Sequence, residues 1–126
     1  MKIKQMLVGK TELKVDILGL GCAPLGGNFV DLTYEDGAKI IKAALQSGMS
    51  YFDTAAWYGF GRSERLVGDC LRHKNYVLSS KVGRILKPGA VQNPLDFGMI
   101  DPLPFHVMYD YSYDGIMRSY EDALQR

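Results

Sequence analysis

Apolar residues in this chain follow two alternating patterns. Short apolar runs at 17–22, 50–53 and 76–81 have the length and composition of buried strands, and the first, ILGLGC, is apolar on both faces, as is typical of a strand in a parallel sheet. Between these runs, residues 33–48 and 63–74 carry apolar side chains at helical spacing. The order strand, helix, strand, helix, strand predicts an α/β fold with a parallel sheet and right-handed crossovers.

Residue types that favour helix ends support these boundaries. Thr33 is a good N-cap and is followed by acidic residues in the first turn, while Gly48 is a natural stop. Ser112 can cap a last helix, which we expect to be still running at Arg126. One side of that helix is apolar and consists of Ile116, Met117, Tyr120, Ala123 and Leu124.

Two segments fall outside the alternation. Apolar residues at 5–8 and 13–15 flank the polar residues 9–12, which predicts an N-terminal β-hairpin. From 83 to about 111 regular patterns disappear, and prolines and glycines interrupt the chain. A loop of this length is more often a functional lid than a plain connection. Tyrosines lie in and just after this loop, at Tyr109, Tyr111 and Tyr113. We expect them to pack within the loop or, if the loop is a lid, to contact a substrate.

Composition narrows the class of protein. The chain has 126 residues, of which 47% are hydrophobic and 23% charged, with a net charge of +1, which suits one soluble globular unit and disfavours nucleic acid as a partner. No apolar run approaches the roughly 18 residues of a membrane span, and residues 1–5 lead into a polar segment with no signal-peptide apolar region. Cys22 and Cys70 have no metal-ligand spacing. We therefore expect a cytoplasmic protein with reduced cysteines, no metal site and no membrane partner.

The candidate chemistry lies where the apolar runs end. A carboxylate at the end of a buried strand, such as Asp53, is costly unless it is paired, and Lys81 ends the next apolar run. Because the carboxyl ends of parallel strands share one face, we expect Asp53, Lys81 and the nearby Tyr58 to meet there. An ammonium stabilises a phenolate, and a carboxylate fixes the ammonium in place. Such a trio suits proton transfer to or from a carbonyl or alcohol oxygen, with the hydride supplied by a cofactor.

A Rossmann-type dinucleotide site is the rival interpretation. Gly19 and Gly21 begin its glycine fingerprint, and Asp53 ends the second strand, where a ribose-binding acid would lie. The third glycine position is occupied by Pro24, however, and a polar loop rather than a helix follows the strand. Since the fingerprint needs both features, we reject this interpretation.

Four segments in the same order and spacing resemble the N-terminal part of an aldo-keto reductase. They are 18–27 (LGLGCAPLGG), 51–59 (YFDTAAWYG), 63–68 (SERLVG) and 79–83 (SSKVG). The resemblance implies a TIM (β/α)8 barrel whose bottom is closed by an N-terminal hairpin. We therefore expect residues 1–126 to form a single, incomplete barrel domain that contains about three of the barrel strands.

The resemblance also implies roles for individual residues. Tyr58 matches the general acid/base, Lys81 the residue that tunes it, and Asp53 the carboxylate that holds the lysine. Trp57 falls beside the substrate pocket, although it could equally be an ordinary aromatic plug. The positions that contact the nicotinamide end of NADP(H) or NAD(H) are matched by Gly21, Cys22 and Asp53. Gly19 and Gly21 could instead serve tight packing alone.

Residues 104–119 are similar to a branch that contains L-fucose, L-galactose and D-threo-aldose 1-dehydrogenases and pyridoxal 4-dehydrogenase. Enzymes of this branch oxidise a cyclic hemiacetal to a lactone with NAD(P)⁺. The implied function is an NAD(P)-dependent oxidoreductase that transfers a hydride between nicotinamide and an aldehyde or an aldose hemiacetal. The family's catalytic histidine and its segment for the adenosine phosphate have no match here, and neither His73 nor His106 stands at the histidine's position.

These departures lead to two further expectations. As given, the chain is expected to be a truncated, inactive fragment that folds poorly alone and self-associates through open sheet edges. The alternative function is a non-catalytic, NADP-binding, redox-sensing subunit built on the same barrel. The presence of Asp53, Tyr58 and Lys81 together argues mildly against a purely structural role.

Overall fold

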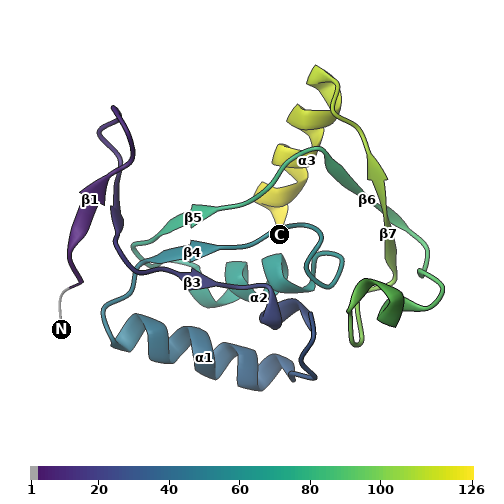
Figure 1. Cartoon of the computed structure of the whole chain (residues 1–126), viewed down its shortest axis with the longest axis horizontal. Helices are drawn as coiled ribbons and strands as arrows, with labels where there is room; N and C mark the ends of the chain where they lie inside the picture. Colours follow the sequence, from purple (N-terminus) through teal and green to yellow (C-terminus); the bar gives the residue numbers. More distant parts are fainter. Residues whose placement is uncertain (1–2) are drawn as a thin grey trace.

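The structure is a computed structural model that describes residues 3–126; residues 1–2 of the start considered above lie outside the described residues. In chain order the elements are β1 (Gln5–Leu7), β2 (Lys14–Asp16), β3 (Leu20–Gly21), η1 (Pro24–Gly26), α1 (Tyr34–Gln46), β4 (Tyr51–Asp53), α2 (Arg62–Leu71), β5 (Val77–Ser79), β6 (Arg84–Pro88), η2 (Pro94–Phe97), β7 (Phe105–Tyr109) and α3 (Tyr113–Gln125). β3, β4 and β5 form a parallel sheet in that order, with α1 and α2 as the crossovers (Figure 1). The predicted α/β alternation is confirmed.

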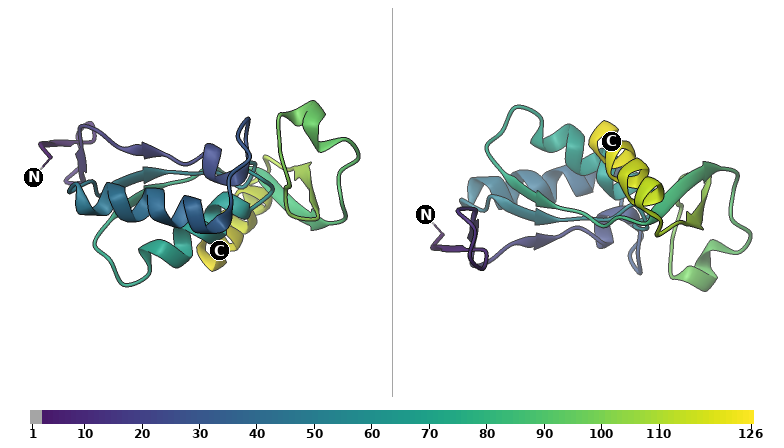
Figure 2. Two further views of the ribbon diagram at one scale, coloured as in Figure 1. Left: turned by 90° about the horizontal axis from the view of Figure 1, so that it is seen from below. Right: turned by 90° about the horizontal axis from the view of Figure 1, so that it is seen from above.

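Both crossover helices lie on one face of the parallel sheet (Figures 1 and 2). Phe52, in the middle of β4, is fully buried against them, and its neighbours Tyr51 and Asp53 point to the opposite face because side chains alternate along a strand. The sheet therefore has an apolar face under the helices and a polar face that can carry chemistry. The apolar core consists of Cys22, Leu25, Ile41, Ala44, Phe52, Leu66, Val67 and Leu71.

The helix ends follow local sequence chemistry. The Thr33 side chain accepts a hydrogen bond from the backbone N–H of Asp36, and Ser112 accepts one from Gly115, as N-cap residues do. Gly48 follows α1 with a φ of 89°, a left-handed conformation that stops a helix. α3 spans Tyr113–Gln125, with Arg126 as its C-cap residue.

The strand predicted at 17–22 is shorter than expected, because only Leu20–Gly21 pairs in the parallel sheet. Ile17 and Leu18 are more than half exposed, and the backbone N–H of Ile17 donates to the carbonyl of Lys4, which continues the β1–β2 hairpin instead. The predicted hairpin itself is confirmed. Buried Asp16 ties it to the start of β4 by accepting from the N–H and the hydroxyl of Ser50.

The segment 83–111 is more regular than predicted. It contains an antiparallel pair in which β6 runs beside β7, with Arg84 opposite Tyr109 and Pro88 opposite Phe105. Prolines did not prevent this pairing because they lie at its ends: Pro88 is the last residue of β6, and Pro104 precedes β7. The irregular part is therefore confined to 89–104.

The connection 89–104 is fastened to the loops that follow β3 and β4. The N–H of Phe29 donates to the carbonyl of Gly98, and the N–H of Ile100 donates to the carbonyl of Gly27. The N–H of Leu103 donates to the carbonyl of Gly59. This connection thus lies at the carboxyl ends of the parallel strands, on the side where the candidate chemistry was expected.

α3 leaves much of its apolar side exposed. Met117, Tyr120 and Leu124, on its predicted apolar side, are exposed by 38%, 50% and 66%. The helix instead buries Gly115 and Ser119, and the Ser119 hydroxyl accepts from the N–H of Gly83 at 2.8 Å. α3 contacts β6, and a Cβ on Gly115 would lie 2.2 Å from the side chain of Asp110, so the helix packs closely at these small residues.

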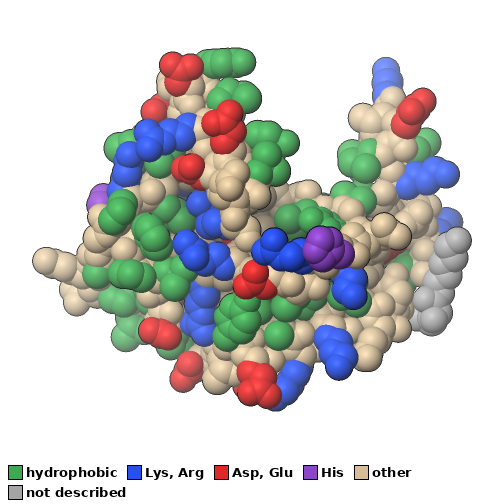
Figure 3. Space-filling model, turned by 180° about the vertical axis from the view of Figure 1, so that it is seen from behind, with side chains coloured by type: hydrophobic (Ala, Val, Ile, Leu, Met, Phe, Trp, Pro, Cys, Tyr) green, Lys and Arg blue, Asp and Glu red, His purple; other side chains and the backbone are tan. Residues whose placement is uncertain are grey.

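Within the described residues, β3 and β5 each have a strand neighbour on one side only. Seen from behind, the surface is hollowed between the β1–β2 hairpin and the part that contains α3 (Figure 3), and β5 runs between these two parts in Figure 1. No helix among residues 3–126 is long and apolar enough to cross a membrane.

We expect the 126-residue chain, expressed alone, to self-associate through these strand edges, because unpaired backbone groups template further pairing. Sedimentation velocity should show oligomers whose proportion rises with concentration. Leu78→Lys places a charge on the 39%-exposed side chain of β5 and should reduce association, whereas Leu13→Lys, in the hairpin, should not. A monodisperse monomer at high concentration would contradict the expectation.

Candidate active site

Asp53 and Lys81 form an ion pair at the carboxyl ends of β4 and β5. Asp53 lies opposite Ser79 in the parallel register, and Lys81 follows two residues later, so both side chains emerge on the same face. The Lys81 Nζ lies 2.7 Å from Asp53 Oδ1 and donates a second hydrogen bond to the carbonyl of Thr54 at 2.9 Å. The partner that the sequence predicted for Asp53 is therefore in contact with it.

Ser79 holds the second oxygen of the carboxylate. Its hydroxyl donates to Asp53 Oδ2 at 2.6 Å and lies 3.2 Å from the Tyr51 hydroxyl. Both carboxylate oxygens are thus engaged, which fixes the plane of the group and the direction in which it holds Lys81. Sequence analysis did not identify Ser79, although its position two residues before Lys81 places it on the same face of the strand.

Each member of the ion pair stabilises the charged form of the other. Burial raises the pKa of Asp53, but the hydrogen bonds from Lys81 and Ser79 outweigh it and hold that pKa below its ordinary value. Burial lowers the pKa of Lys81, but its interactions with Asp53 and then Tyr58 together outweigh burial and raise that pKa. Both groups therefore stay charged around neutral pH.

Tyr58 lies beside this pair. The Lys81 Nζ is 5.1 Å from the centre of the Tyr58 ring. The tyrosine backbone is fixed in a tight turn, since its N–H donates to the carbonyl of Ala55 and its carbonyl accepts from the N–H of Ser63. A Cβ on Gly26 would lie 2.4 Å from the carbonyl carbon of Tyr58, so the loops after β3 and β4 pack backbone against backbone here. The structure brings all three predicted residues together.

Trp57 is half-buried in an aromatic cluster at the same end of the sheet. Its ring packs edge-on against those of Phe60 and Phe97, the latter from the connection 89–104. The distances between ring centres are 5.5 Å to Phe60 and 5.7 Å to Phe97. The guanidinium carbon of Arg84 lies 4.9 Å from the centre of the Trp57 ring. Sequence analysis did not identify Arg84, because the pairing of β6 with β7 that brings it here was not predicted.

The proposed cofactor positions lie next to Asp53. Gly21 pairs with Asp53 across the sheet, and a Cβ on Gly21 would meet no atom within 4 Å, so it borders open space. Gly19 differs, because a Cβ added there would lie 2.6 Å from the Tyr51 ring. Close packing against Tyr51 therefore accounts for a glycine at this position. Cys22 is fully buried, and burial raises the pKa of its thiol to about 12. Only the backbone of Cys22 therefore lies at the candidate site.

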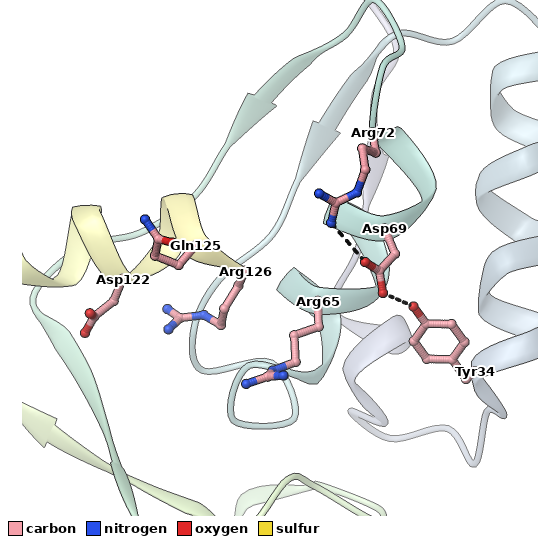
Figure 4. Close-up of a pocket in the computed structure, with 7 residues that line it drawn as sticks. All are labelled: Tyr34, Arg65, Asp69, Arg72, Asp122, Gln125 and Arg126. Atoms are coloured by element: carbon pink, nitrogen blue, oxygen red, sulfur yellow. Dashed lines mark hydrogen bonds and ion pairs between the residues drawn. The ribbon is translucent and has the colours of Figure 1, made fainter.

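A cavity of about 560 Å³ lies elsewhere, beside α2 and the end of α3 (Figure 4). Its lining includes Asp69, which accepts from the Tyr34 hydroxyl and from Arg72, and none of the predicted site residues. Residues 3–126 contain no group of three or more His, Cys, Asp or Glu side chains placed to hold a metal ion.

Comparison with known proteins bears on this geometry. Residues 17–126 match the sequence model of the Aldo/keto reductase family. The chain belongs to this family. It is 45% identical to a pyridoxal 4-dehydrogenase of Microbacterium luteolum (94% of this chain, 38% of that protein), 32% identical to a D-threo-aldose 1-dehydrogenase of Pseudomonas sp (90% and 37%) and 28% identical to an L-galactose dehydrogenase of Arabidopsis thaliana (99% and 34%).

Solved structures of this family share the fold. A glycerol dehydrogenase of Gluconobacter oxydans has a TM-score of 0.71 at 26% identity, over 96% of this chain and 35% of its own. A Bacillus halodurans aldo-keto reductase in its holo form has a TM-score of 0.71 at 26% identity, over 98% and 36%. The resemblance found in the sequence is thus confirmed, and the fold is part of the family's barrel. The chain spans 34–38% of the length of the three relatives named above.

The ion pair predicts a specific pH dependence of stability. Because the folded pKa of Asp53 is lowered, its contribution is present above its unfolded pKa of about 3.9 and is lost as the pH falls through the folded value. The pair is partly exposed, so the contribution should be about 0.5–1 kcal/mol. We expect thermal unfolding midpoints of Asp53→Asn to lie below wild type at pH 7, with a gap that narrows below about pH 4.

Glu12→Gln, in the exposed hairpin turn, is the matched control and should show no gap. Since the folded pKa of Lys81 is raised, its contribution is complete below the unfolded value of about 10.4 and should not limit stability at acidic pH. A gap between Asp53→Asn and wild type that stays constant down to pH 2 would show that the ion pair does not stabilise the fold.

Proposed function

We propose that the protein containing this chain is an NAD(P)-dependent oxidoreductase that transfers a hydride between nicotinamide and an aldehyde or cyclic hemiacetal carbon. The observation that carries this proposal is the Asp53–Lys81 ion pair beside Tyr58 at the strand ends. Membership of the aldo/keto reductase family supports it independently.

Tyr58 acts as the acid/base in this proposal. In oxidation its oxygen takes the proton from the hemiacetal hydroxyl, and in reduction its hydroxyl gives a proton to the carbonyl oxygen. The Lys81 ammonium stabilises the negative charge that develops on the phenolic oxygen, and Asp53 keeps that ammonium in place. Ser79 fixes the carboxylate in turn.

The nicotinamide cofactor, when bound, supplies or accepts the hydride that no side chain can carry. The open space beside Gly21 and its adjacency to Asp53 fit a flat ring at the end of β3. Gly21, Asp53 and the backbone of Cys22 would hold its nicotinamide end.

The substrate class follows from the relatives' names. Two of them act on an aldose or on galactose and one on pyridoxal, so we propose a small carbonyl compound or sugar as the substrate, with Trp57 beside it. Reduced Cys22 and Cys70 fit a cytoplasmic enzyme.

Tyr58→Phe in the complete natural protein tests the assignment. Loss of the proton-transfer group should reduce turnover of L-galactose or pyridoxal by about 10²–10⁴-fold, while NAD(P)H binding is retained. Turnover is followed by absorbance of the reduced cofactor and binding by its fluorescence. Tyr76→Phe, which changes a tyrosine just before β5, is the matched control and should keep full activity.

Two results would overturn the proposal. Undiminished turnover in Tyr58→Phe would remove Tyr58 as the acid/base. Cofactor binding without turnover of any carbonyl substrate in the wild type would favour the redox-sensing subunit instead.

A further inference from the structure

Arg84 occupies an unusual position for a cation on a strand. It is the first residue of β6 and lies directly opposite Tyr109 on β7. Because paired residues of antiparallel strands place their side chains on the same face, the guanidinium lies near the Tyr109 ring, 5.6 Å from its centre. The same guanidinium carbon lies 4.9 Å from the centre of the ring of Trp57, in the loop that follows β4. Two aromatic rings therefore hold the guanidinium group.

The hydrogen-bond donors of Arg84 are unused within the described residues. Arg62, Arg72 and Arg126 each donate to a carbonyl or carboxylate. Arg65, Arg84 and Arg118 make no side-chain hydrogen bond or ion pair with residues 3–126, and of these three only Arg84 is partly buried. Contacts with aromatic rings engage the flat face of a guanidinium, and its N–H groups remain free to donate around its edge. Arg84 is only half-exposed, so these donors gain from an oxygen acceptor.

The position of Arg84 relative to the candidate active site suggests what the acceptor is. Trp57, which the guanidinium contacts, immediately precedes Tyr58, and Arg84 follows Lys81 by three residues through the turn at Gly83. The charge of Lys81 is balanced by Asp53, while that of Arg84 is balanced by no described side chain. An unpaired cation on Trp57, the residue before Tyr58, favours substrates that carry oxygen acceptors.

We propose that Arg84 is a substrate-binding residue that donates hydrogen bonds to hydroxyl or phenolate oxygens of an oxygen-rich substrate. The proposal rests on the proposed function, because it concerns the same site, and it adds the group that distinguishes hydroxylated substrates from plain aldehydes. Trp57 and Tyr109 hold the guanidinium plane, and the substrate takes the donors at its edge. Loss of such a charge-assisted contact lowers binding of the ligand that makes it and leaves other ligands almost unchanged.

The test compares Arg84→Met with three probes in the complete natural protein loaded with NADP⁺ or NAD⁺. The probes are L-galactose, with hydroxyl oxygens; pyridoxal, with a phenolic hydroxyl that can ionise and a hydroxymethyl group; and benzaldehyde, with no oxygen besides the carbonyl. Dissociation constants are measured by calorimetry in the Tyr58→Phe background, where turnover does not consume the probe. In parallel, kcat/KM is measured with Tyr58 intact.

We expect Arg84→Met to raise the Kd of L-galactose, pyridoxal or both by about 10-fold or more and that of benzaldehyde by less than about 3-fold. A loss for L-galactose alone identifies sugar hydroxyls as the acceptors, and a loss for pyridoxal alone identifies the oxygen substituents of its pyridine ring. Lys87→Met, which removes another cation of the same strand, is the matched control and should change no Kd. Arg84→Lys keeps the charge but not the planar donor edge and should recover only part of the affinity.

Other outcomes overturn the proposal. Equal losses for all three probes mean that Arg84 only supports Trp57 and the fold, and unchanged Kd values mean that it binds no substrate. A wild type that binds neither L-galactose nor pyridoxal also contradicts it. The experiment also separates failure of the proposed function from failure of this proposal. If the wild type turns over no probe but binds L-galactose or pyridoxal in an Arg84-dependent way, the oxidoreductase assignment is overturned and the proposed role of Arg84 in binding is kept.

Discussion

The ion pair between Asp53 and Lys81 is the interaction on which the candidate site depends. A carboxylate on the polar face of a parallel sheet needs a partner, and the parallel register supplies one by placing Lys81 two residues beyond the position opposite Asp53. Ser79 takes the remaining carboxylate oxygen. The pair in turn places the Lys81 ammonium beside Tyr58. The relative positions of Asp53, Lys81 and Tyr58 therefore follow from strand order and register rather than from a single unusual residue.

Backbone contacts between loops provide the second constraint. A Cβ on Gly59 would lie 2.1 Å from the carbonyl oxygen of Gly26, and Gly59 has a φ of 64°, so this turn needs a glycine. The close approach holds Trp57 and Tyr58 at the carboxyl ends of the strands. The connection 89–104 is hydrogen-bonded to the same loops and brings Phe97 onto Trp57. Rigid loops of this kind position side chains without help from regular secondary structure.

Local signals in the sequence were enough to predict much of this arrangement. Thr33 and Ser112 cap the helices as expected, and the apolar runs that end in Asp53 and near Lys81 indicated which residues would meet. Catalytic roles for these residues remain predictions.

Long-range pairing explains what the sequence did not reveal. The β6–β7 pair depends on contacts between residues about 20 positions apart, and its prolines resembled those of an irregular loop. Arg84 was missed for that reason. A hydrophobic pattern also does not detect the small residues that α3 buries, Gly115 and Ser119.

The most direct test of the account is the Lys81→Met variant of the complete natural protein. If Lys81 acts by stabilising charge on the Tyr58 oxygen, kcat should fall by about 10²–10⁴-fold, as expected when acid/base catalysis is lost, while the Kd of the cofactor changes little. A kcat that stays within a few-fold of wild type would show that the ion pair beside Tyr58 holds the fold together without taking part in the chemistry.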